Sequence, residues 1–140
     1  MRNNDTAILW FRRTMWIGIA VNITVAVPAL FSPNTILELL TIPAAATPIW
    51  VSFTANLLIL LSLFYIPAAI DPVAHKYTAS LAVLARWAGV GFFTAAVYVF
   101  GESPSYLILG LIDLMFGLPL TILLWRIFRR HKVEPVFAPT

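Results

Sequence analysis

Four long runs of apolar residues, separated by short polar stretches, make up most of the chain. They cover roughly 8–31, 50–70, 79–100 and 106–128, and the second run contains no charged residue. At a rise of ~1.5 Å per residue, about 20 apolar residues in a helix cross the ~30 Å hydrocarbon core of a bilayer. The pattern therefore predicts an all-α integral membrane protein built as a four-helix transmembrane bundle.

The stretch between the first two runs predicts a short helix that does not cross the membrane. Ser32 begins a Ser-Pro-Asn-Thr sequence that is typical of a turn and a helix N-terminus. The following segment, 35–40, is aliphatic apart from Glu38, and Pro43 follows closely. So few residues cannot span a bilayer, and we expect this helix to lie in the membrane interface.

Composition supports lipid as the solvent of this chain. Of its 140 residues, 61% are hydrophobic and 11% are charged, and the mean hydropathy is +0.90. Soluble domains are about 25% charged.

The length predicts a single domain, 1–140. The first apolar run is too long for the core of a cleavable signal peptide, so we expect none. There is no cysteine, which excludes disulfides and thiolate metal sites.

The distribution of charge predicts the topology. The nine Lys and Arg residues lie near the N-terminus, between the second and third runs, early in the third run, or at the end of the fourth run and after it. The other two loops carry Glu38 and Glu102 instead. By the positive-inside rule both termini are cytoplasmic, which requires an even number of spans. The basic tail, 129–140, is then explained by topology and anionic lipid rather than by nucleic acid. Glu38 and Glu102 then make an outer acidic face. This face is either simply solvated or a docking surface for a basic partner.

Each predicted span contains a polar residue at a similar depth. Counted from the outer ends of the spans, these residues lie roughly 10–14 Å below the outer surface. We therefore expect a common intramembrane polar layer. Its members are Asn22, Asn56, Thr94 and Asp113.

Asp113 is the most informative member of this layer, because a carboxylate within a span costs ~2.5–3.5 kcal/mol and usually faces the bundle interior. Gly110 and Gly117 lie on its helical face and favour close packing there. Three interpretations are open. Asp113 binds a proton or ligand reached from outside, or it bonds to Asn22 or Asn56 and fixes the bundle, or it pairs with another subunit.

Arg86 is another charged residue inside a predicted span. It falls near the cytoplasmic end of the third span, where a long side chain can extend to the lipid headgroups. An ion pair with Asp71 is the alternative.

Several kinds of chemistry are excluded or disfavoured. His75 and His131 lie outside the spans, so no intramembrane pair is present to hold haem b. No Ser/His/Asp set, HExxH motif or phosphate-binding loop is present. Asp71 and His75, four residues apart, give only a weak signal for a metal. We expect no cofactor, and no enzyme activity by this chain alone.

The four spans, the stretch LFSPNTILELLTIP, the stretch YIPAAIDP and the glycine-flanked Asp of the fourth span resemble the small DoxX-like membrane proteins of bacteria. The resemblance implies a four-helix fold and a setting among membrane redox systems, including quinone-linked oxidoreductases. It assigns no catalytic residue to this chain.

The leading hypothesis is therefore a non-catalytic accessory or anchoring subunit of a larger complex in the bacterial cytoplasmic membrane, respiratory or otherwise redox-linked. The alternatives are a small transporter with Asp113 as its titrating group, and a quinone- or lipid-binding bundle. For the last, the candidate wall residues are Phe92, Phe93, Tyr98 and Phe100.

Overall fold

The structure is a computed structural model that describes residues 2–131, and side chains from 6 to 129. All the regular secondary structure formed by these residues is helical. In chain order they are α1 (Arg2–Phe31), α2 (Pro33–Leu39), α3 (Pro48–Ile70), α4 (Lys76–Tyr98), the single 3-10 turn η1 (Pro104–Tyr106) and α5 (Leu107–His131). Four of the described helical segments are long and apolar enough to cross a membrane. The predicted four-helix transmembrane bundle is confirmed, as is the short helix between its first two spans.

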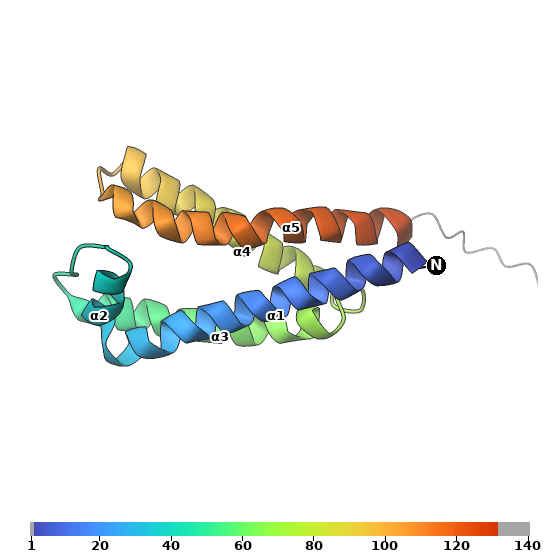
Figure 1. The fold of residues 1–140 in the computed structure, drawn as a ribbon, viewed down its shortest axis with the longest axis horizontal. Coiled ribbons are helices and arrows are strands. Elements are labelled where there is room, and N and C mark those ends of the chain that lie inside the picture. Colours follow the sequence, from blue (N-terminus) through green and yellow to red (C-terminus); the bar gives the residue numbers. More distant parts are fainter. Residues whose placement is uncertain (1, 132–140) are drawn as a thin grey trace, which may run out of the picture.

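The helices α1, α3, α4 and α5 run up and down the bundle, so the N-terminus and the end of α5 lie at the same end of the molecule (Figure 1). We call this the terminal end. The other end, which carries α2 and the turn between α4 and α5, is the distal end. Gly101 makes that turn with φ of +72°, a conformation that glycine adopts without strain. The cytoplasmic side remains a prediction, and most of the basic tail lies outside the described residues.

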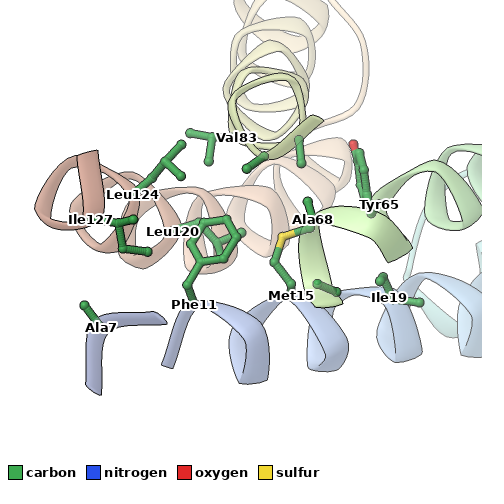
Figure 2. Packing of buried hydrophobic residues seen from close by; sticks show 13 residues of the cluster. Ala7, Phe11, Met15, Ile19, Tyr65, Ala68, Val83, Leu120, Leu124 and Ile127 are labelled. Carbon is green, nitrogen blue, oxygen red and sulfur yellow. The ribbon is translucent and has the colours of Figure 1, made fainter. Parts of the chain in front are cut away.

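All four spans pack tightly in the terminal half. Phe11 and Met15 of α1 face Leu120 and Ile127 of α5, with Ala68 of α3 beside them (Figure 2). Small side chains on α3 and α4 are fully buried here and let the backbones approach closely. Because lipid tails are as apolar as these side chains, the core is held by packing contacts rather than by exclusion of water.

In the distal half the bundle separates into two pairs of helices. There α1 stays with α3, while α4 stays with α5 (Figure 1). A second, smaller core of Ala26, Ala29 and Ala55 joins α1 to α3. The short helix α2 contacts only this pair among the described elements, through α1 and α3. The two pairs are thus joined along one half of their length.

Asp71 directly follows the last residue of α3, and its side chain stabilises the turn before α4. Its Oδ1 accepts hydrogen bonds from the backbone N–H groups of Val73 (2.9 Å) and Ala74 (3.0 Å). These bonds stabilise the carboxylate and lower the pKa of Asp71. An ion pair between Asp71 and Arg86, one of the two alternatives for Arg86, is not formed; Arg86 has another partner.

Candidate functional site

A partly buried ion pair crosses the centre of the bundle. Arg86 of α4 donates from Nη1 to Oδ1 of Asp113 on α5, at 2.8 Å. The side chain of Arg86 is 8% exposed and that of Asp113 is 19% exposed. The same guanidinium donates from Nη2 to Oδ1 of Asn22 on α1, at 3.2 Å. One cation therefore connects three of the four spans.

The fourth span joins through Asn22. Its Nδ2 donates to Oγ of Ser62 on α3, at 3.1 Å, and this hydroxyl donates to the carbonyl of Leu58 in its own helix, at 2.8 Å. Asn22 and Ser62 are both buried. We call Asn22, Ser62, Arg86 and Asp113 the polar network. Each span contributes one member, and the shared hydrogen bonds fix the spans relative to one another.

Three glycines make room for the ion pair. A Cβ at Gly89 would overlap Oδ2 of Asp113, so α4 can approach the carboxylate only because residue 89 has no side chain. A Cβ at Gly117 would lie 3.2 Å from Cβ of Arg86, and one at Gly18 would lie 3.2 Å from Nη2 of Arg86. Of the two glycines on the helical face of Asp113, Gly117 makes room for Arg86, whereas Gly110 makes room for Phe93, since a Cβ there would lie 3.3 Å from Cβ of Phe93.

Two sequence-based interpretations of these charges are wrong. Arg86 does not extend to the headgroups: α4 begins at Lys76 and ends at Tyr98, which places Arg86 near the middle of the helix, and its side chain is buried. Asp113 does not bond directly to Asn22 or Asn56. It is connected to Asn22 through the guanidinium of Arg86.

The predicted polar layer forms only in part. The network unites Asn22 with Asp113, but Asn56 and Thr94 lie at exposed positions on the outside of the bundle. The Thr94 hydroxyl donates to the carbonyl of Val90 one turn earlier, at 2.7 Å. Ser62 and Arg86 occupy the places in the network that were predicted for Asn56 and Thr94. Glu38 in α2 and Glu102 in the turn after α4 are both exposed at the distal end.

A cleft of about 630 Å³ lies in the distal half of the bundle. Its walls are mostly apolar and come from α1, α2, α3, α4, η1 and α5. Three members of the polar network, Asn22, Arg86 and Asp113, also line it. We call it the distal cleft. Of the aromatic candidates, Phe92 and Phe93 line the cleft, whereas Tyr98 and Phe100 are exposed elsewhere.

The charged lining of the cleft has spare hydrogen-bonding capacity. A guanidinium carries more N–H donors than the two bonds that Arg86 makes to described residues. Oδ2 of Asp113 likewise has no hydrogen bond to a described residue. The cleft is thus an apolar space that offers donors and an acceptor to a guest. Among residues 2–131, no group of three or more His, Cys, Asp or Glu side chains could hold a metal ion.

Comparison with known proteins gives no relative: no protein-family model, no curated protein and no solved structure matches this chain. The similarity to DoxX-like proteins therefore stays a prediction from the sequence. What the protein does has to be argued from the network and the cleft themselves.

Proposed function

We propose that this protein binds a lipophilic molecule with a polar head, of the lipid or quinone class, in the distal cleft. A single observation carries the proposal: a large cleft with apolar walls reaches a buried guanidinium that has donors to spare. Ligand sites in proteins have this character, since apolar walls provide affinity and a few polar groups fix orientation. The volume of about 630 Å³ falls within the usual range for such sites.

The position of the cleft agrees with a guest that enters from lipid. The helix pairs separate at the distal end, which the predicted topology places at the outer side of a bacterial cytoplasmic membrane. The apolar part of the guest lies between Phe92 and Phe93 on one pair and Ala26 and Ala55 on the other. Its head reaches the guanidinium of Arg86. An acceptor group at this position gains hydrogen bonds that lipid cannot provide.

Filling the cleft from one wall tests this function. Leu109 of α5 lines the cleft, whereas Leu111, two positions along the same helix, is 55% exposed and does not. We expect Leu109→Trp to reduce the amount of bound lipophile at least about tenfold, because the indole occupies the volume of the guest. A tenfold reduction corresponds to a loss of about 1.4 kcal/mol of binding free energy. The measurement is mass spectrometry of molecules extracted from protein purified in nanodiscs.

Leu111→Trp is the matched control, since it adds the same side chain on the lipid-facing side and should leave the bound content unchanged. Equal lipophile content in Leu109→Trp, Leu111→Trp and the unmodified protein would contradict the proposed function.

An accessory role in a larger membrane complex is a second candidate, favoured by Asn56. This amide sits eight residues into α3, on the exposed surface and outside the cleft, and no described residue supplies a hydrogen bond to it. An amide facing hydrocarbon is unfavourable unless another helix satisfies it, and such interhelical bonds contribute about 1–2 kcal/mol in model peptides. A partner subunit with a polar residue at this depth would satisfy it.

Asn56→Leu should therefore weaken association with that partner by about 5- to 30-fold, as measured by quantitative co-purification from native membranes. Leu57→Ala, at the neighbouring exposed apolar position, is the control and should retain more of the partner. If Asn56→Leu retains every partner at the unmodified level, an accessory role through this face is wrong.

A further inference from the structure

We propose that the guest of the distal cleft is an acidic lipophile, a long apolar chain with an anionic head, and that it binds together with a proton that is taken up by Asp113. The inference rests on the proposed function and narrows it to a class of ligand. It follows from an asymmetry between the two members of the ion pair: the cation is held in place by several contacts, and the anion by one.

Arg86 keeps its position without Asp113. Its Nη2 bonds to Asn22, which is itself held by Ser62, and its guanidinium lies 5.3 Å from the centre of the Phe116 ring. Gly18 leaves room for Nη2 and Gly117 leaves room for the Cβ. A guanidinium cannot lose its proton at any ordinary pH. The cleft therefore ends on a permanent, fixed positive charge.

Asp113 is the replaceable partner. Its carboxylate makes one hydrogen bond to a described residue, the bond to Nη1 of Arg86. It lines the cleft, and its side chain is more exposed than that of Arg86. An anionic head that enters the cleft can bind the same guanidinium that binds the carboxylate of Asp113. Such a head can take the place of Asp113 without moving Arg86, because Asn22 and Phe116 still hold the cation.

Charge balance then requires a proton. Arg86 and Asp113 together are neutral, so an added anion would leave a net negative charge in a medium of low dielectric constant, at a large cost. If the displaced carboxylate of Asp113 takes one proton from the bulk solvent, the O–H bond of a hydronium ion breaks, an O–H bond on Asp113 forms, water is released, and the site is neutral again. One anion and one proton are taken up, no other covalent bond is made or broken, and the ion pair between Asp113 and Arg86 is replaced by one between the ligand head and Arg86.

No other described group along the cleft can substitute for Asp113 as the proton acceptor at neutral pH. Asp113 faces Arg86 of α4 and interacts electrostatically with Tyr65 of α3, while α1 presents the uncharged Asn22. Tyr106 of η1 also lines the cleft. Tyrosines are already protonated at neutral pH. Among the described lining residues, Asp113 is the only carboxylate.

The decisive experiment uses a ligand that cannot titrate. A long-chain alkyl sulfonate is a permanent anion, so any proton taken up on binding must enter the protein. We expect uptake of about one proton per sulfonate bound, followed with an indicator dye in weakly buffered nanodiscs. The apparent dissociation constant should rise about tenfold for each unit of pH above neutrality, as linkage to one proton requires. Palmitate and a long-chain alkyl phosphate, compared with methyl palmitate, then show whether a carboxylate or a phosphate head binds more tightly.

Asp113→Asn removes the proton acceptor while preserving shape. This variant should bind the sulfonate without proton uptake and with an affinity that does not change with pH. Proton uptake that persists in Asp113→Asn would overturn the proposal. Where the variant does not fold, proton uptake by the unmodified protein decides the matter alone.

The controls separate this inference from the function beneath it. In one outcome, methyl palmitate binds as tightly as the sulfonate, neither ligand causes proton uptake, and Leu109→Trp abolishes binding. This outcome would contradict the acidic-lipophile proposal but would agree with the proposed binding function. Binding of none of these ligands in a manner sensitive to Leu109→Trp would count against both.

Discussion

Asp113→Asn should destabilise the ligand-free bundle by about 3–5 kcal/mol, the usual cost of breaking a buried ion pair from one side. The substitution keeps the size of the side chain but removes its charge. It leaves the guanidinium of Arg86, whose side chain is 8% exposed, without a compensating negative charge. Because arginine cannot neutralise itself by losing a proton, the penalty cannot be relieved as it is for a buried carboxylate.

Reversible unfolding in mixed micelles, followed by far-UV circular dichroism, measures this effect. Glu102→Gln is the control: it removes the same charge from an exposed loop position and should change stability by no more than about 0.5 kcal/mol. The pair Arg86→Met with Asp113→Leu removes both charges and should recover much of the loss, since apolar replacements of buried ion pairs are often neutral or better. A cost below about 1 kcal/mol for Asp113→Asn would show that the pair does not hold the bundle.

The spans were predictable because hydropathy alone determines which segments can lie in lipid. The ends of the helices were less so. The helix predicted from 79 begins at Lys76, and the one predicted to end at 128 continues to His131. Charged residues are excluded from hydrocarbon but not from a helix, so a helix that extends into the interface carries them beyond the apolar run. Hydropathy marks the membrane boundary, not the last helical hydrogen bond.

The site was predictable only as far as depth can locate it. Asn22 and Asp113 were identified because polar groups are rare within spans, and they do lie in one network. Depth along a helix says nothing about direction around it. Asn56 lies next to buried Ala55 in α3, yet it points outward. To predict whether Asn56 faces the interior, one must know how α3 is oriented about its own axis. Only packing against the other helices defines this orientation.

Arg86 and Ser62 were missed for different reasons. Arg86 was assigned to the headgroups because its helix was expected to begin later, which put it near an end. A serine in a span is ordinary, since its hydroxyl can bond to its own helix, as Ser62 does to Leu58. The role of Ser62 in the network becomes visible only when the structure places Asn22 of α1 within hydrogen-bonding distance of its hydroxyl. The distal cleft depends on the separation of two helix pairs, a tertiary property that the apolar pattern does not encode.

Gly89 carries the second large effect expected here. A Cβ at this position would overlap Oδ2 of Asp113, so Gly89→Ala must either turn the carboxylate away from Arg86 or push α4 and α5 apart. We expect a loss of about 1–3 kcal/mol, the usual range for adding a methyl group to a packed interior. The same unfolding measurement applies.

Gly91→Ala, on the same helix, isolates the cause. A Cβ at Gly91 would meet nothing within 4 Å, and alanine is the better helix former, so this variant should be neutral or slightly stabilised. The overlap also predicts coupling: in an Asp113→Ala background the cost of Gly89→Ala should largely disappear, because the added methyl group then has no carboxylate to displace. Equal costs in both backgrounds would mean that residue 89 is glycine for the sake of backbone approach alone, and that the carboxylate does not depend on it.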